Sequence, residues 1–199
     1  MILKVESIAK AFGKNRVLRD VSFTMDSGSL YGIVGENGSG KSTLLKIIVG
    51  EWKSDGGNIS VNGRIGYCPQ QSLLFSQLTV DEHFQYFSAA YGMDKTTVGP
   101  RSEILMNYFN FIKFRKEKIS DLSGGTQQKL NLAIAMLHQP DILILDEPYS
   151  GFDWDTYLRF WDYTDHLQKE GCTILIVSHL LTDKEKFDKV YNLENGQLT

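Results

Sequence analysis

The sequence predicts an α/β fold in which a parallel sheet is joined by an antiparallel N-terminal sheet and an inserted helical segment. Apolar runs such as "DILILDEP" and "CTILIVSH" alternate with helical patterns in the last third of the chain. Continuous apolar strands between helices are typical of a parallel sheet covered on both faces. The first quarter instead alternates apolar with polar residues, and a glycine-rich loop follows the run "SLYGIV".

The N-terminal elements are predicted from this alternation. "ILKVESI" and "VSFTM" have the period of half-buried antiparallel strands. After the glycine-rich loop, "TLLKIIVG" has helical apolar spacing, and Gly50 is expected to end that helix. The Asn62-Gly63 pair lies between two short apolar runs, which predicts a β-hairpin at that point.

The middle of the chain changes to helical spacing. Thr79 and Glu82 stand at the spacing of a capping box, and apolar residues then recur every three or four positions. "SEILMNYFNFIKF" predicts a second, aromatic-rich helix. We therefore expect one domain over residues 1–199, with a helical subdomain at about 72–120 inside a core formed by about 1–71 and 121–199.

Composition excludes several classes of partner. The chain has 199 residues and a formal net charge of −3, so no basic field suggests nucleic acid as a ligand. Its two cysteines, Cys68 and Cys172, match no metal-ligand spacing. Since no apolar run approaches the roughly 18 residues that a membrane span needs, the chain is not expected to cross a membrane itself.

The glycine-rich loop predicts a phosphate site. "GENGSGKS", Gly35 to Ser42, fits the pattern G-x-x-x-x-G-K-[ST] between a predicted strand and a predicted helix. Backbone N–H groups of such a loop converge on phosphate oxygens, while Lys41 would reach the β- and γ-phosphates and Ser42 would bind Mg²⁺. A glycine-rich turn without a ligand is the alternative, but the flanking elements favour a phosphate-loop NTPase core. The expected nucleotide-binding residues here are Gly35, Asn37, Gly38, Ser39, Gly40, Lys41, Ser42 and Thr43.

An acidic pair predicts the other half of this site. Asp146 and Glu147 follow directly on the apolar run "ILIL", which predicts a buried strand. Ligands of open α/β sheets bind at the carboxyl ends of strands, so this pair is expected to face the phosphate loop. Asp146 would hold Mg²⁺, and Glu147 would act as general base on the attacking water. Two acids after a strand can also be a solvated strand end; their pairing with the phosphate loop favours the catalytic interpretation.

A second glycine-rich turn opens the helix "TQQKLNLAIAMLH". In "LSGGT", Ser123 and the amides of Gly124 and Gly125 could bind a second anion. The same residues could equally form a helix N-cap with flexible glycines, and taken alone they favour that simpler reading.

Together these residues resemble the nucleotide-binding domain of an ATP-binding cassette (ABC) protein over nearly the whole chain. "GENGSGKS" is similar to the family's Walker A motif, "ILILDEP" to Walker B and "LSGGT" to the signature. Gln70 matches the Q-loop glutamine, with Gln71 as a less favoured register; Ser150 to Asp153 matches the D-loop, and His179 the switch histidine. Phe12 stands where the family stacks an aromatic ring on adenine.

The resemblance implies ATP and Mg²⁺ as ligands and assigns roles to these positions. Glu147, His179, Gln70 and Lys41 are expected to be catalytic. Ser42, Gln70 and Asp146 are expected to bind the metal. The signature of one subunit would complete the phosphate site of another in a homodimer or heterodimer, with Asp153 linking the two sites. Three positions depart from the commonest family pattern: Thr126, Tyr149 and Phe152. Tyr149 and Phe152 add bulk near where the subunits should meet.

The resemblance also implies a purpose: the ATPase subunit of a membrane transporter, bound peripherally to the cytoplasmic face through transmembrane subunits. The apolar residues Leu74, Phe75, Leu78 and Phe84 are candidates for that contact where they are exposed, and at least half of them are expected to belong to the core instead. "LSGGTQQKL" is similar to cassettes of bacterial exporters, so export is favoured over import. A soluble cassette, for example an iron–sulfur assembly ATPase, is the alternative; a degenerate cassette that only binds nucleotide is disfavoured because all the catalytic positions are filled.

Overall fold

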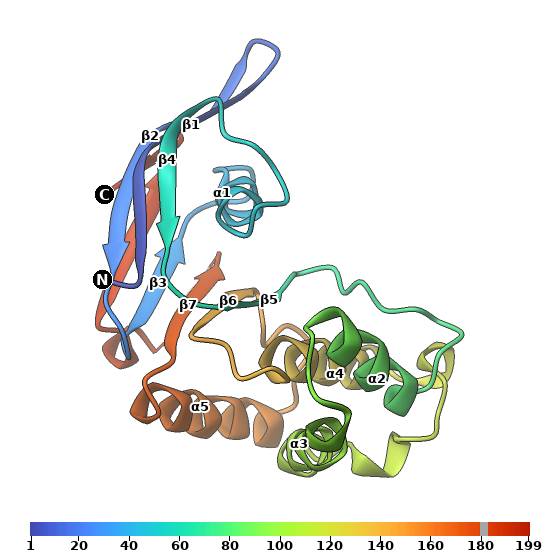
Figure 1. Cartoon of the computed structure of the whole chain (residues 1–199). Coiled ribbons are helices and arrows are strands. Elements are labelled where there is room, and N and C mark those ends of the chain that lie inside the picture. The colour runs from blue at the N-terminus through green and yellow to red at the C-terminus, as the bar shows by residue number, and fades with distance from the viewer. Residues whose placement is uncertain (180–182) are drawn as a thin grey trace. The chain divides into compact units, whose positions relative to one another are not determined.

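The computed structural model of the chain describes residues 1–179 and 183–199 and divides into two compact units (Figure 1). The first unit contains the sheets and comprises Met1–Tyr67, Asp141–Glu147 and Leu167–Thr199. The second contains most of the helices and comprises Cys68–Pro140 and Pro148–His166. Each unit is considered by itself below.

The strands appear where alternating or continuous apolar runs predict them. They are β1 (Leu3–Phe12), β2 (Asn15–Met25), β3 (Leu30–Val34), β4 (Gly56–Val61), β5 (Ile65–Cys68), β6 (Ile142–Asp146), β7 (Thr173–Ser178), β8 (Lys189–Glu194) and β9 (Gln197–Leu198).

In the described residues these strands form two sheets. One is antiparallel with the order β2-β1-β4, and the other has the order β5-β6-β7-β3-β8-β9. Within the second sheet β6, β7, β3 and β8 pair in parallel, while β9 adds an antiparallel edge. The predicted fold class, an α/β core with an N-terminal antiparallel sheet and a helical insertion, is therefore confirmed.

The hairpin predicted at Asn62-Gly63 is wrong. β4 pairs with β1 in the antiparallel sheet, whereas β5 lies beside β6 in the other sheet. The Asn-Gly pair is instead the crossover between sheets, and it is anchored there: the amide of Arg64 donates to Oδ2 of Asp141 at 2.7 Å. Long-range pairing has thus overridden a local turn signal.

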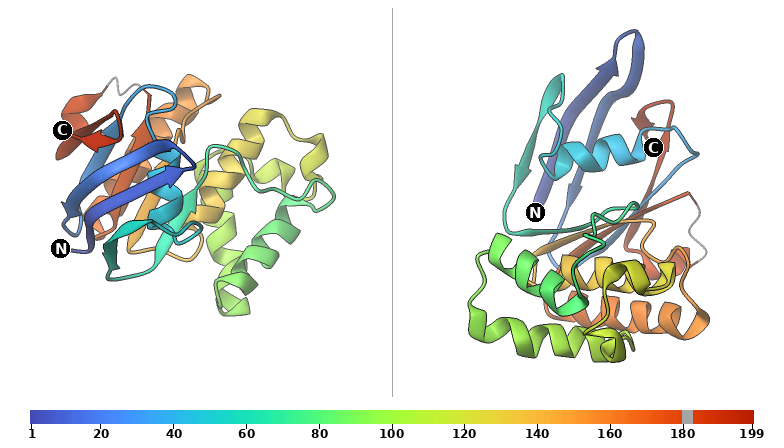
Figure 2. Two further views of the ribbon diagram at one scale, coloured as in Figure 1. Left: turned by 90° about the horizontal axis from the view of Figure 1, so that it is seen from above. Right: turned by 90° about the vertical axis from the view of Figure 1, so that its right-hand side faces the viewer.

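The core of the first unit joins both sheets through helix α1 (Lys41–Ile48). Figure 2 shows α1 running alongside the antiparallel sheet, and its Leu44 and Leu45 are fully buried. Val49 caps the helix and Gly50 follows with φ of 80°, which confirms the predicted stop. α1 is thereby held rigidly behind the phosphate loop.

The helices of the second unit follow the predicted spacing with shifted ends. They are α2 (Val80–Ala90), α3 (Lys95–Tyr108), α4 (Gly124–Met136) and α5 (Trp154–Lys169), whose last turn belongs to the first unit. Short 3₁₀ turns lie at Ile112–Phe114, Ile119–Asp121 and Lys184–Lys186.

The predicted capping box of α2 is confirmed, and the second predicted helix is corrected. Thr79 accepts from the amide of Glu82 while the carboxylate of Glu82 accepts from the amide of Thr79. α3 begins earlier than expected, at an N-cap provided by Asp94, and ends at Tyr108 because Asn110 turns the chain with φ of 56°.

The predicted subdomain boundaries at about 72 and 120 stay a prediction. No helix among the described residues is long and apolar enough to cross a membrane.

Candidate nucleotide site

The loop that joins β3 to α1 has the backbone that a phosphate cradle needs. Gly40 caps α1 with φ of 107°, in the region that only glycine adopts readily. A Cβ at Gly40 would lie 2.9 Å from Cδ2 of Leu18 and 3.1 Å from Val17. Any other residue at this position would therefore be strained and would clash, so the loop can take this path only with glycine.

The ammonium of Lys41 is drawn back over the loop. Lys41 is only 8% exposed, and its Nζ donates to the carbonyl oxygens of Gly35 at 2.6 Å and Glu36 at 3.0 Å. These carbonyls hold the charge above the first turn of α1, where the helix dipole already favours an anion.

Two hydroxyl groups complete the loop. The Oγ of Ser39 is buried and, among the described residues, has no hydrogen-bond partner, which is costly unless a ligand supplies one. The Oγ of Ser42 donates to Oδ2 of Asp146 at 3.0 Å. The loop and the end of β6 thus meet side chain to side chain, as expected from the sequence.

Asp146 is almost fully buried, with 3% of its surface exposed. Burial raises the pKa of its carboxyl above the ordinary value, and the hydrogen bond from Ser42 opposes that shift only in part. Burial thus destabilises the ionised form of Asp146, and a cation bound beside it would stabilise that form.

Glu147 is held in a strained and fully occupied position. Its backbone has φ of 50°, which is uncommon for a residue with a Cβ. The hydroxyl of Ser178 donates to Oε2 at 2.8 Å, the amide of His179 donates to Oε1 at 2.6 Å, and Nδ1 of His179 lies 2.8 Å from Oε1. Asp146 is therefore bonded to the phosphate loop, whereas Glu147 is bonded to residues at and just after the end of β7.

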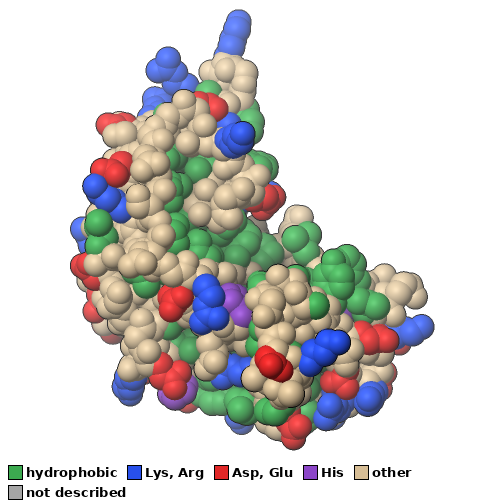
Figure 3. All heavy atoms as spheres, viewed as in Figure 1, with side chains coloured by type: hydrophobic (Ala, Val, Ile, Leu, Met, Phe, Trp, Pro, Cys, Tyr) green, Lys and Arg blue, Asp and Glu red, His purple; other side chains and the backbone are tan. Residues whose placement is uncertain are grey.

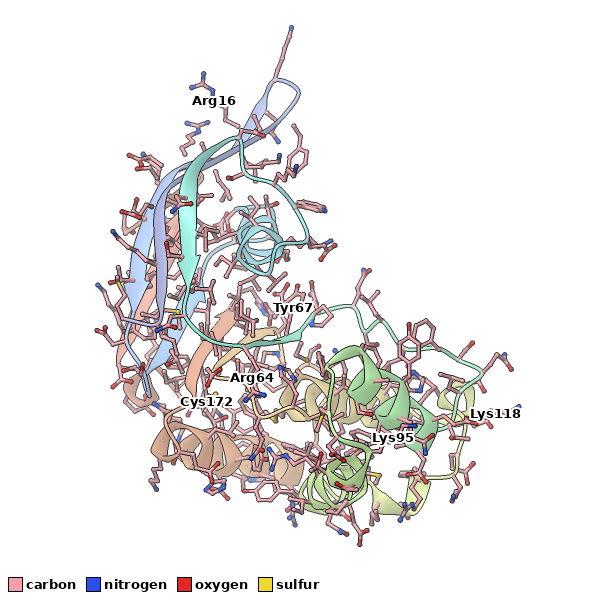
Figure 4. All side chains as sticks on the ribbon, viewed as in Figure 1. Arg16, Arg64, Tyr67, Lys95, Lys118 and Cys172 are labelled. Atoms are coloured by element: carbon pink, nitrogen blue, oxygen red, sulfur yellow. The ribbon has the colours of Figure 1, made fainter. Side chains whose placement is uncertain are left out.

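A pocket of about 520 Å³ lies beside the loop, on the side of the β1–β2 turn and the β8–β9 turn. Arg16, Val17 and Arg19 line it together with Asn37 and Ser39, and Figure 4 labels Arg16 at that end of the antiparallel sheet. These β2 residues were not among the predicted site residues; the signal for them in the sequence was their position just after Phe12.

Phe12 is not among the lining residues of that pocket. Its ring is 48% exposed and meets Trp52 edge-on, with the ring centroids 5.5 Å apart. Lys10 lies 5.6 Å from the Phe12 ring. The assignment of Phe12 to adenine stacking thus stays a prediction about the nucleotide-bound state.

The signature segment opens α4 in the second unit. Ser123 is the N-cap, and its Oγ accepts from the amide of Thr126 at 3.3 Å. Gly124 and Gly125 are the first two helical residues, whose amides have no partner within a helix. Thr126 places its own hydroxyl 3.0 Å from that of Ser123, so the departure at Thr126 leaves the N-cap intact.

A family model described as "ABC transporter" matches residues 18–150, more than half of the chain. The chain belongs to the ABC transporter family. It is 35% identical, over 98% of its length, to an uncharacterized ABC transporter ATP-binding protein of Methanocaldococcus jannaschii, of which it covers 75%. It is 32% identical, over 96% of its length, to the Nod factor export ATP-binding protein I of Burkholderia lata, of which it covers 67%.

A solved structure titled as the ATP-binding subunit of an ABC transporter has the same fold. The TM-score is 0.94 at 28% identity, and the match covers all of this chain and 88% of that one. The chain is thus an ATP-binding subunit with the ATPase domain of the ABC family, in which ATP hydrolysis is coupled to transport.

Two bulky side chains contact helix α5 of their own chain: Phe152 in the D-loop, and Tyr149 just before it. The ring of Tyr149 packs edge-on against Phe160 at 5.7 Å and Tyr157 at 5.6 Å, and the ring of Phe152 lies 6.4 Å from Phe160. Both side chains are half-buried. Their extra volume is therefore taken up inside the second unit.

The structure brings together only part of the predicted site. Lys41, Ser42, Asp146, Glu147 and His179 meet within the first unit. Phe12 and the other loop candidates also belong to the first unit. Four candidates belong to the second unit, where Gln70 is exposed: Gln70, Ser123, Gly124 and Gly125.

Proposed function

We propose that this cassette hydrolyses ATP between the phosphate loop and the acids at the end of β6, and that it thereby drives a membrane exporter. The observation that carries the proposal is the pair of contacts around Asp146 and Glu147: Ser42 bonds to the first acid, and His179 and Ser178 bond to the second. Asp146 would thus bind the metal ion, and Glu147 would remain available to act on the attacking water. Phosphoryl transfer requires both roles.

The residues of the loop fit a magnesium nucleotide. The unpartnered Oγ of Ser39 and the amides at the start of α1 supply donors, and Lys41 would exchange its bonds with Gly35 and Glu36 for phosphate oxygens. Ser42 and Asp146 would hold Mg²⁺, with Gln70 as a further ligand. The bound ion would neutralise charge on the β- and γ-phosphate oxygens.

Glu147 would take the proton from the attacking water. Two donors, Ser178 and the amide of His179, already fix its carboxylate, so little ordering remains to be done at the moment of reaction. The His179 ring is 65% exposed and can therefore leave Glu147 to approach a phosphate oxygen.

Some of the other predicted residues would contact the nucleotide of their own subunit, and some would act between subunits. Phe12 would stack on adenine, while Asn37, Gly38 and Thr43 would line the nucleotide in the same subunit. Ser123, Gly124 and Gly125 would bind the γ-phosphate of a second cassette, because free amides at a helix N-terminus suit an anion. Donors that arrive only on closure stabilise the transition state most.

The partner is proposed to be a transmembrane subunit and the direction to be export, with the cassette peripheral on the cytoplasmic face. The relative of Burkholderia lata is named for the export of Nod factor, and the sequence "LSGGTQQKL" independently favours export.

Replacement of Glu147 by glutamine tests the catalytic assignment. In Glu147→Gln the amide keeps the shape but loses the base, so we expect kcat to fall by about 100-fold or more while ATP still binds. ATP-loaded Glu147→Gln should also elute as a dimer in size-exclusion chromatography. The matched control is Glu6→Gln, at a half-buried position on β1 outside the proposed site, which should hydrolyse ATP normally; a Glu147→Gln variant with normal turnover would refute the assignment.

A further inference from the structure

A buried amide on α4 holds the segment that leads into the Q-loop. Asn131 is 6% exposed, and its Nδ2 donates to the carbonyl oxygen of Pro69 at 2.9 Å and to Sγ of Cys68 at 3.3 Å. All three residues belong to the second unit. Figure 4 labels Tyr67, the neighbour of Cys68 on β5.

Packing alone does not explain an asparagine at this position. Asn131 is buried, and a buried amide costs free energy unless its protons are bonded. Asn131 uses both protons, one on a backbone carbonyl and one on a thiol. An aliphatic side chain would fill the same space and would need no hydrogen-bond partners. What asparagine adds at this position is therefore its pair of hydrogen bonds to Pro69 and Cys68.

The bond to Pro69 has a direct geometric consequence for Gln70. The carbonyl of Pro69 and the amide and Cα of Gln70 share one planar peptide group. Proline also fixes its own φ and has no N–H, so its carbonyl is the one backbone group there that can be held by a hydrogen bond. Fixing this oxygen therefore fixes the direction in which the chain enters Gln70.

We propose that Asn131 is a positioning residue for Gln70, acting through the Pro69 carbonyl, with the Cys68 thiol as its second anchor. This inference rests on the proposed function in so far as Gln70 is taken to act at the phosphate site. Asn131 itself contacts neither nucleotide nor metal. Its role is to keep the Q-loop glutamine in one orientation.

A double-mutant cycle on the full chain tests the proposal. We expect Asn131→Ala to lower kcat about fivefold to tenfold, the effect of one or two lost hydrogen bonds, with the Kd for ATP changed less than about twofold. In a Gln70→Ala background the same substitution should lower kcat no further, because nothing remains to be positioned. Asn131→Leu, which fills the cavity, should behave as Asn131→Ala does.

The matched control is Ser102→Ala. Ser102 is 5% exposed in the same unit and donates to the carbonyl of Gly99 at 3.0 Å within α3, so it is a buried polar residue far along the chain from every motif. We expect Ser102→Ala to affect melting temperature and to leave kcat unchanged. If Ser102→Ala lowered kcat as Asn131→Ala does, general destabilisation would explain both effects and the proposal would fail.

Hydrogen exchange separates this proposal from the assignment of Gln70. Asn131→Ala should speed exchange of the amides at Gln70 and Gln71 by about tenfold, and Ser102→Ala should not. If Gln70→Ala has normal kcat, the proposed role of Gln70 is wrong, yet faster exchange would still support the anchoring by Asn131. Unchanged exchange in Asn131→Ala, or an equal loss of kcat with and without Gln70, would overturn the inference.

Discussion

Asp146 carries a conflict between stability and function. Burial raises the pKa of this carboxyl, so the native state holds its proton to a higher pH than the unfolded chain does. Where the native state binds more protons than the unfolded state, the free energy of unfolding falls as pH rises. The ionised Asp146 that a metal site needs is therefore a cost to the nucleotide-free fold at neutral pH.

We predict that Asp146→Asn is more stable than the parent chain at pH 7 and has lost its activity. The amide oxygen can still accept from Ser42, while the cost of a buried charge is gone. If that cost is about 1 kcal/mol, the melting temperature without nucleotide should rise by about 2–4 °C.

The pH dependence supplies the control for this prediction. Below about pH 4, the ordinary range of a carboxyl pKa, both states of the parent chain are protonated and the gain should disappear. The exposed Asp165→Asn should show no gain at either pH. A lower melting temperature for Asp146→Asn at pH 7 would contradict the account.

At the scale of elements, the crossover between β4 and β5 shows how tertiary contacts choose among local options. Gly63 has φ of 135°, and a Cβ there would lie 2.7 Å from Cβ of Asp141. The amide of Arg64 bonds to the same aspartate. The turn is thereby fixed to the start of β6, and β5 is delivered to the edge of the parallel sheet instead of folding back on β4.

We predict that Gly63→Ala is more harmful than Gly13→Ala. Gly13 also has positive φ, of 61°, but a Cβ there meets nothing within 4 Å. The change at Gly13 should cost about 1 kcal/mol of unfolding free energy through the backbone alone. At Gly63 the overlap with Asp141 adds to the backbone strain, and we expect about 2–4 kcal/mol in total. Equal losses in urea titrations would mean that the Asp141 contact does not fix the crossover.

At the scale of the whole molecule, the burial pattern revises the surface offered to a membrane partner. Phe84, a predicted contact, is only 1% exposed and belongs to the core, while Leu74 and Leu78 are half-buried. Leu73, at 74% exposed, and Phe75, at 45% exposed, are the accessible residues of this segment. Figure 3 shows hydrophobic side chains gathered over the stretch that leads from β5 to α2.

We predict that replacing Leu73 and Phe75 together by serine detaches the cassette from membranes. Loss of two large apolar contacts of roughly 1.5–3 kcal/mol each should lower the membrane-bound fraction more than tenfold, and ATP binding should be unchanged. Ile104→Ser is the control, since Ile104 is 53% exposed in the same unit but outside this segment. Sedimentation of native membranes with each variant measures the effect, and full retention of the double variant would exclude this surface.

The sequence was most informative where one short segment builds its own geometry. The segment from Leu30 to Ser42 is a strand, a turn and a helix start in immediate succession, so residue type and spacing were sufficient to predict it. The capping box of Thr79 and Glu82 is of the same kind. In such segments the backbone conformation of each residue depends on neighbours within a few positions along the chain, so it can be predicted from the sequence.

Phosphate loops and strand-end acids are local patterns, so the residues that could carry the chemistry were predictable from the amino-acid sequence. How Glu147 is held depends on the folded chain, because Ser178 and His179 lie 31 and 32 residues further along it. It also decided that Gly63 crosses between sheets and that Phe84 is core while Leu73 is surface. Those choices minimise exposed apolar area and unpaired polar groups over the whole chain, and that sum cannot be taken one segment at a time.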